Sequence, residues 1–361
     1  MNGFSAAATL SLKNPEPLVR LVSDDLAGHG ARVTDEPGLV KLDFKLGSAT
    51  MAYGPGRLDL RAEAQRQGDL LYLRMILAGH LVEHSEQRPE ILWTGDGTDV
   101  VYPPNFRVMR VERVVDVTPH MRRLTLSGED IGWFDQEAMH VRMMIPPRGI
   151  EPEWPTVDRS GLVRFPEGDR KLAVRKYTIR SIDVAKGLVD MDFVIHEAGP
   201  GSEFAMKAGI GDLVGMAGPG GGGCDAARNY LIAGDETALP AIARICEAMA
   251  DDATGTVYVE IADPGEEQRF RLPAGVRLVW LHRNGEEAGI SRLLVDAVKS
   301  HPWPDELDGF YAWVACEFAA FRELRTYLRA ERKLPRDQHL AVAYWRRGES
   351  EDSFGKNKEK H

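Results

Sequence analysis

The spacing of hydrophobic and polar residues changes along the chain. Residues 15–30 (PEPLVRLVSDDLAGHG) and 70–85 (LLYLRMILAGHLVEHS) place apolar residues three and four apart, which predicts amphipathic helices, whereas residues 38–64 read as strands. Residues 94–105 (TGDGTDVVYPPN) then supply the Gly, Asp and Pro that are typical of a linker. We therefore predict a small N-terminal α/β accessory domain over residues 1–96.

Short strand-like runs dominate the next part of the chain. They cover residues 106–118, 121–128, 140–147, 162–166, 175–183, 188–197 and 211–218. Most of these runs follow one another without a long helix between them, which favours an antiparallel β-barrel. We place this barrel domain at residues 104–223.

Strands alternate with helices in the C-terminal part. Apolar runs typical of buried strands cover residues 229–235, 256–263, 276–283 and 309–317, and helical patterns cover 238–250, 289–300 and 319–332. This alternation predicts a parallel sheet with helices on its faces. The α/β domain is expected at residues 227–348, followed by a charged tail at 349–361 (ESEDSFGKNKEKH).

Composition narrows the possible partners and compartment. The 361 residues suit two or three domains, and the net charge of −10 argues against nonspecific binding to nucleic acid. The N-terminal segment lacks the basic start and long apolar stretch of a signal peptide, and no apolar run reaches the length of a membrane span, so we expect a cytoplasmic protein. Three widely separated cysteines, Cys224, Cys246 and Cys316, predict reduced thiols and no zinc or iron–sulfur cluster.

Residues 175–181 (RKYTIRS) combine cations, an aromatic ring and a hydroxyl on one short strand. In a regular strand Arg175, Tyr177 and Ile179 share one face, while Thr178 and Arg180 share the other. Taken alone, the segment is equally compatible with a strand that binds a ligand and with an edge strand whose charges are solvated.

Two further segments have the form of phosphate-binding turns. Residues 196–202 (HEAGPGS) follow a strand, and Gly199, Gly201 and Ser202 expose backbone N–H groups before a helical stretch that Ser202 can cap. In AGDETALPAI, Thr237 begins a helix after a buried strand, where the loop faces the usual nucleotide crevice. Asp235 in the same loop, with the following glutamate, would repel a pyrophosphate if it faced one. The glycines at 218–223 precede a strand and are interpreted as a hinge.

Two other features have simpler explanations. His80 and His84 lie four residues apart on one predicted helical face, as metal ligands often do. The segment lacks the HExxH order and an evident third ligand, so an ordinary helix face is favoured and we predict no metal site. Cys316 ends a buried-type strand, and inert packing in the core is favoured over a role beside a nicotinamide.

Taken together in order, these segments resemble the siderophore-interacting protein family. The resemblance runs from about residue 106 to 352 and includes RKYTIRS, the 192–222 region, YLIAGDETALPAIARI, WVACEFAAFRELRTYLR and YWRRG. It implies a ferredoxin–NADP reductase type of fold, bound FAD, and reduction of ferric siderophores that releases Fe(II). The first 93 residues resemble a small uncharacterised α/β domain that occurs fused to such proteins.

The resemblance also implies roles for residues. Arg175 is expected on the FAD pyrophosphate, Tyr177 against the isoalloxazine, Thr178 at its edge, and His196 near the adenine-side ribose or phosphate. The whole expected FAD-binding set is Arg175, Tyr177, Thr178, Ile179, Arg180, Val194, His196, Gly199, Gly201, Ser202 and Thr237. The expected substrate-binding set is Arg180, Arg346 and Arg347. No catalytic side chain is expected, because the flavin carries the chemistry.

The sequence leaves alternatives open for the electron donor and for the class of function. The strand–loop–helix at AGDETALPAI and the short tail favour NADPH or NADH over ferredoxin. Asp263 suits a free ribose hydroxyl and Arg269 a 2′-phosphate, and the resemblance favours NADPH. A module that binds ferric siderophores without turnover, and a general flavin or quinone reductase, are the alternative functions.

Overall fold

The computed structural model describes residues 3–87, 89–97, 102–196, 199–304, 306–350 and 353. Contacts divide the chain into two compact units, residues 1–106 with 146–172 and residues 107–145 with 173–361. Residues 98–101 of the predicted linker and most of the predicted tail lie outside the described residues.

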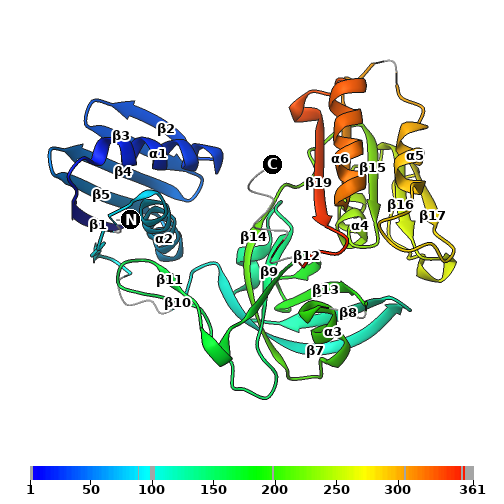
Figure 1. Cartoon of the computed structure of the whole chain (residues 1–361), viewed down its shortest axis with the longest axis horizontal. Helices are drawn as coiled ribbons and strands as arrows, with labels where there is room; N and C mark the ends of the chain where they lie inside the picture. Colours follow the sequence, from blue (N-terminus) through cyan, green and yellow to red (C-terminus); the bar gives the residue numbers. More distant parts are fainter. Residues whose placement is uncertain are drawn as a thin grey trace. The chain divides into compact units, whose positions relative to one another are not determined.

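The first unit contains a six-stranded antiparallel sheet in the order β2-β3-β4-β5-β1-β6 (Figure 1). Its elements are β1 (Phe4–Ser11), α1 (Pro15–Gly28), β2 (Arg32–Glu36), β3 (Leu39–Phe44), β4 (Gly47–Gly54), β5 (Arg57–Ala64), α2 (Gln67–His84) and β6 (Thr94–Gly95). In β5, buried Leu58 and Leu60 alternate with more exposed residues, so one face of the sheet is covered. Both helices pack against each other and against this sheet.

A hairpin from the middle of the chain belongs to this first unit. It pairs β10 (Thr156–Val157) with β11 (Val163–Arg164), and Leu162 packs against the first unit's core. The indole nitrogen of Trp93 donates a hydrogen bond to the carbonyl of Ser160 at 3.0 Å. The run at residues 162–166, which we expected among the barrel strands, therefore lies in the other unit.

The second unit begins with a closed six-stranded barrel, β12-β13-β8-β7-β14-β9. Its strands are β7 (Phe106–Thr118), β8 (Met121–Ser127), β9 (His140–Ile145), β12 (Ala173–Asp183), β13 (Leu188–Val194) and β14 (Leu213–Gly220), with α3 (Pro200–Lys207) between the last two. Methionine, leucine and phenylalanine side chains fill the interior, including the fully buried Phe134 and Phe193. The predicted antiparallel barrel is confirmed. The glycine-rich run expected as a hinge begins inside β14.

The rest of the second unit is a five-stranded parallel sheet in the order β17-β16-β15-β18-β19 (Figure 1). Its elements are β15 (Asn229–Asp235), α4 (Leu239–Ala248), β16 (Thr254–Ile261), β17 (Gly275–His282), α5 (Leu293–Lys299), β18 (Phe310–Glu317), α6 (Phe318–Thr326) and β19 (His339–Trp345). Every residue of β18, which lies between β15 and β19, is buried because both faces of the sheet are covered. The predicted α/β domain is confirmed.

The two sides of this sheet have separate cores. Residues of α4 form one core with Met121 and Met139, and α4 contacts β12 of the barrel. Residues of α5 and α6 form the other core. Among the residues that the structure describes, no helix combines the length and apolar character needed to cross a membrane.

Candidate flavin and substrate site

The RKYTIRS segment lies in β12, where it pairs with β9 on one side and β13 on the other. Thr178 is opposite His140 in β9, and the pairing with β13 is irregular between Ile179 and Ser181. Thr178 and Ile179 are buried, whereas Lys176 is exposed. The irregularity matters because it changes the direction of the strand at Arg180.

Tyr177 brings this strand against the N-terminus of α3. Its ring lies 4.3 Å from the ring of Phe193, measured between centroids. A Cβ atom on Gly201 would lie only 2.0 Å from the Tyr177 hydroxyl oxygen, so the hydroxyl occupies the space that a side chain would need. A side chain at position 201 would therefore displace the Tyr177 hydroxyl.

The rest of the predicted phosphate-binding turn is held in place around that helix end. Gly199 has φ of 111°, a conformation that favours glycine, and precedes α3. The buried Ser202 hydroxyl accepts a hydrogen bond from the His196 N–H and donates one to its carbonyl, at 2.9 and 2.7 Å. Val194 ends β13 directly before this turn. Residues 197 and 198 lie outside the described residues.

These groups fit an FAD. Arg175 is half-buried two residues before Tyr177, and one of its nitrogens donates to the carbonyl of Val174 at 2.7 Å. The glycines at 199 and 201 carry no side chains over the start of α3, whose N–H groups favour an anion. A cation, an aromatic ring and a helix N-terminus are the groups that bind a pyrophosphate and a flat ring.

Thr178 joins the barrel to the end of the parallel sheet. Tyr344, in β19, is hydrogen-bonded to Thr178, and its hydroxyl lies 2.6 Å from Nε2 of His140. Burial raises the pKa of Tyr344 well above its usual range, so the hydroxyl stays neutral. Sequence reasoning missed Tyr344 and His140. The only signal was that Tyr344 directly precedes the WRRG segment.

Arg180 pairs with a carboxylate of the neighbouring helix α4. Both terminal nitrogens of its guanidinium lie 2.7 Å from the carboxylate oxygens of Glu247 in α4, and its side chain is 11% exposed. Arg244, one turn earlier on the same helix, donates to the carbonyl of Ile179 at 3.1 Å. This arrangement ties the barrel to α4.

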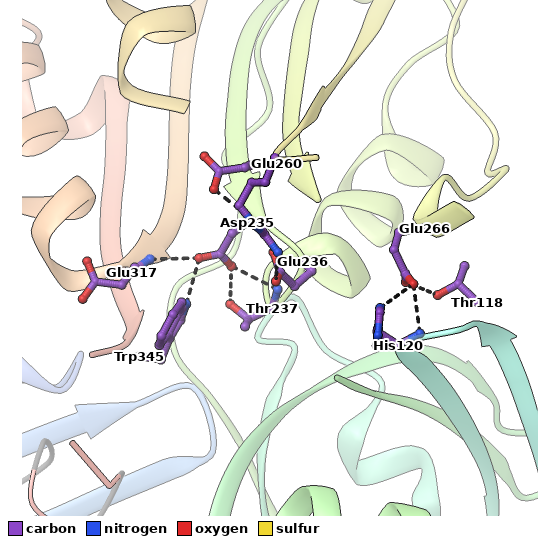
Figure 2. A network of polar contacts seen from close by, with 10 residues as sticks. Thr118, His120, Asp235, Glu236, Thr237, Glu260, Glu266, Glu317 and Trp345 are labelled. Atoms are coloured by element: carbon purple, nitrogen blue, oxygen red, sulfur yellow. Dashed lines mark hydrogen bonds and ion pairs between the residues drawn. The ribbon is translucent and has the colours of Figure 1, made fainter. Parts of the chain in front are cut away.

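Polar side chains gather at the carboxyl ends of the parallel strands (Figure 2). Asp235, at the end of β15, accepts hydrogen bonds from the backbone N–H and hydroxyl of Thr237, from the indole of Trp345 at 2.8 Å, and from the N–H of Glu317 at 2.9 Å. Burial and the neighbouring Glu236 raise the pKa of Asp235 to about 7. Thr237, Trp345 and Glu317 all donate hydrogen bonds to Asp235, however, and such bonds favour the charged carboxylate over the protonated acid. Thr237 is thus used to hold Asp235.

The acidic loop at the end of β15 is partly neutralised. Glu236 receives two hydrogen bonds from Arg283, both at 2.7 Å, and a nitrogen of Arg283 lies 3.5 Å from Glu260. Burial raises the pKa of Glu260. A pyrophosphate would therefore meet a paired Glu236 rather than a free one, although Arg283 is already engaged.

A cavity of about 110 Å³ lies beside this network, lined by five acidic side chains and two arginines. The acidic residues are Asp235, Glu236, Glu260, Glu317 and Glu323, and the basic ones are Arg283 and Arg292. Cys316 also lines the cavity but is buried, and burial raises the pKa of its thiol well above the usual range, in agreement with inert packing. Excess carboxylates disfavour a dianion at this position.

A wider depression of about 540 Å³ follows. Four basic side chains line it, Lys299, Arg322, Arg346 and Arg347, together with three acidic ones, Glu317, Glu323 and Glu331. Arg346 and Arg322 lie 4.8 and 5.8 Å from the centroid of the Phe318 ring. Arg346 pairs with Glu349, and Arg347 with Glu287, on the surface. Both arginines come directly after Tyr344 and Trp345, the last residues of β19. The depression is therefore continuous in sequence with the strand whose Tyr344 contacts Thr178.

Figure 2 also shows a second contact between the barrel and the parallel-sheet domain. The buried Glu266 accepts hydrogen bonds from the Thr118 hydroxyl and the His120 N–H, and its carboxylate lies 2.8 Å from Nδ1 of His120. Asp263, which we considered for a ribose, accepts a hydrogen bond from the N–H of Gly265 at 2.7 Å. Its carboxylate therefore caps a local turn.

Two family models match the second unit in succession. A model described as "Siderophore-interacting FAD-binding domain" matches residues 110–223, and one described as "Siderophore-interacting protein" matches residues 227–348. Ferric vibriobactin reductase ViuB of Vibrio cholerae is 32% identical over 274 residues, which are 72% of this chain and 95% of that protein. The chain belongs to the siderophore-interacting protein family.

Other family members agree with this placement. The crystal structure of the siderophore-interacting protein SipS from Aeromonas hydrophila superposes with a TM-score of 0.61 at 29% identity, covering 71% of this chain and 97% of that one. The NADPH-dependent ferric-chelate reductase of Escherichia coli is 28% identical over 248 residues, 66% of this chain and 92% of that protein. The family models begin at residue 110, after the N-terminal sheet.

Proposed function

We propose that this protein is an FAD-dependent reductase of ferric siderophores. The observation that carries the proposal is the continuous path from the flavin-type groups on β12, through Thr178 and Tyr344, to the basic depression at Arg346 and Arg347. The names of ViuB and the E. coli relative support the same chemistry.

The chain's own residues would bind and orient the FAD cofactor. Arg175 and the N-terminus of α3 would hold the pyrophosphate, and Tyr177 would pack against the ring system. Thr178, which is hydrogen-bonded to Tyr344, would meet the edge of the ring system. When bound, FAD supplies the means to take two electrons from a donor and pass them singly to Fe(III).

The basic depression suits an anionic ferric complex. Its four cations, Lys299, Arg322, Arg346 and Arg347, outnumber the three glutamates of the lining, in a protein whose net charge is −10. Phe318 adds an aromatic ring close to the guanidinium groups of Arg346 and Arg322, and an aromatic chelating group could pack in the same place. We propose Arg346 and Arg347 as substrate-binding residues and leave Arg180 in its structural pair.

We propose NADPH as the electron donor and ferredoxin as the alternative. Asp263 is engaged as a cap, whereas Arg269 is exposed and available to a 2′-phosphate. The acid-lined cavity beside Asp235 disfavours a pyrophosphate there, so the donor would have to bind outside it. Anaerobic stopped-flow mixing with NADPH, NADH and reduced ferredoxin decides this point: bleaching of the flavin by ferredoxin alone would contradict the choice.

The test of substrate binding is the steady-state reduction of ferric tris-catecholate complexes. Replacing Arg346 or Arg347 with Ala should raise KM about fivefold, because an exposed charge pair contributes about 1 kcal/mol. KM of the unchanged protein should also rise with ionic strength. Arg336→Ala, on an exposed residue outside the depression, is the control. A KM that changes neither with ionic strength nor with these substitutions would refute electrostatic capture. Failure to reduce any ferric chelate would leave the two alternatives, the binding module and the general flavin or quinone reductase.

A further inference from the structure

Four potential metal ligands meet where the two helices of the first unit end. Asp25 and His29 lie four residues apart in the last turn of α1 and just after it, and His80 and His84 lie four apart at the end of α2. The four side chains thus form two pairs with the spacing that puts ligands on one helical face.

The distances bring these groups around one point. One carboxylate oxygen of Asp25 lies 2.8 Å from Nδ1 of His80 and 2.8 Å from Nε2 of His84. One ligand atom from each of these three residues lies within 4.8 Å of the others. Nδ1 of His29 is 3.8 Å from the other oxygen of Asp25, and its ring is 5.3 Å from that of His80.

We propose that Asp25, His80 and His84, with His29 as the fourth ligand, bind one divalent transition-metal ion of the zinc type. Zinc binds imidazole nitrogen and carboxylate oxygen at about 2.0–2.2 Å, so ligand atoms in a tetrahedral site lie about 3.4 Å apart. The separations in the cluster fall on both sides of that value, and small side-chain rotations would reach it. Each histidine would then carry its proton on the nitrogen that faces away.

Two physical features favour a cation over a simple hydrogen-bonded triad. The cluster lies at the carboxyl ends of both helices, where the helix dipoles are negative. A triad needs only one histidine to hold Asp25, whereas three imidazoles converge here on a single carboxylate. The predominance of imidazole selects transition metals, because Mg²⁺ and Ca²⁺ prefer oxygen ligands.

The test is calorimetric titration of the full chain, loaded with FAD and freed of metal by a chelator. Zn²⁺ and Co²⁺ should bind with one ion per chain, at least about 100-fold more tightly than Mg²⁺ or Ca²⁺. Zn²⁺ should also raise the unfolding temperature of the first unit, since binding to the folded state stabilises it.

The variants separate ligation from hydrogen bonding. His84→Gln and His80→Gln keep an N–H donor for Asp25 but remove the imidazole, so each should weaken Zn²⁺ binding at least about 100-fold while the protein still folds. Asp25→Asn should do the same, and Asp24→Asn, an exposed neighbour on the same helix, should bind Zn²⁺ normally. Absence of saturable Zn²⁺ binding by the unchanged protein, or binding by either glutamine variant as tight as that of the unchanged protein, would overturn the proposal.

Discussion

Replacing Gly201 with Ala tests whether Tyr177 seats the flavin against α3. The new Cβ would lie 2.0 Å from the Tyr177 hydroxyl oxygen and 3.0 Å from the ring carbon that bears it. Ordinary contact begins near 3.4 Å, so the hydroxyl would have to move by about 1.4 Å. Because the Tyr177 ring also packs on Phe193, the movement cannot be confined to the hydroxyl.

The expected magnitude follows from overpacking. Inserting a methyl group into a packed site costs about 1–3 kcal/mol, and we expect the free energy of unfolding to fall by that amount. If Tyr177 moves away from the flavin ring, the dissociation constant of FAD should rise by about 5- to 150-fold, which corresponds to the same range of free energy. Fluorescence titration of FAD into apoprotein measures the dissociation constant, and denaturant unfolding measures stability.

Two further variants isolate the contact. Gly209→Ala is the control, because the nearest atom to its new Cβ is a carboxylate oxygen of Asp212 at 3.9 Å. Adding Tyr177→Phe to Gly201→Ala removes the atom at 2.0 Å and leaves one at 3.0 Å, so it should recover part of the lost stability. Wild-type FAD affinity in Gly201→Ala, or no recovery in the double variant, would refute this reasoning.

The remaining predictions concern three charged side chains. Arg175→Ala should weaken FAD binding by at least about 1.5 kcal/mol, the order of a lost charged hydrogen bond. Lys176→Ala, at the neighbouring exposed position, should leave FAD binding unchanged. Equal FAD affinities of the two variants in a fluorescence titration would mean that the pyrophosphate binds elsewhere. Asp235→Asn at pH 8 should lower the free energy of unfolding by about 2–4 kcal/mol. The reason is that an amide NH₂ group replaces one of the two carboxylate oxygens and then faces groups that themselves donate hydrogen bonds. Asp252→Asn, on an exposed turn, is the control, and matching denaturant midpoints would contradict the role of Asp235. Hydrogen bonds from Arg292 and Lys299 lower the pKa of Glu323 to about 2 from 4.5, so its stabilisation is complete above about pH 4.5 and is lost as the pH falls toward 2. Since the side chain is 35% exposed, Glu323→Gln should cost at most about 1 kcal/mol at pH 7 and close to nothing at pH 2; a deficit that persists at pH 2 would show that another interaction was removed.

Much of the second unit could be predicted because its signals are local. A barrel of short strands and a parallel sheet with helices differ in the spacing of apolar residues, which can be read within ten or twenty residues. The loop around Gly199 and Gly201 was recognisable for the same reason, since glycines and a capping serine follow one another directly. Tyr177 and Gly201, which make the contact, are about 24 residues apart in sequence. Only the hairpin of β12 and β13 and the following turn lie between them.

Contacts between distant segments were decided only by tertiary packing. No pattern near Arg180 indicated that Glu247 of α4 would take its guanidinium, and none near Asp235 indicated Trp345. The parallel sheet brings the ends of β15, β18 and β19 together, so residues that are far apart in sequence share buried donors and acceptors. Their pairing follows because buried polar groups must find partners wherever the fold places them.

The first unit shows the same division most clearly. The sequence by itself determined two amphipathic helices, and with them the pair formed by His80 and His84 on one face. It offered no third ligand, because Asp25 lies 55 residues earlier and comes within 2.8 Å only when the two helices pack on the sheet. Helical spacing is a property of a short segment, whereas the meeting of two helices depends on which apolar faces the whole unit buries.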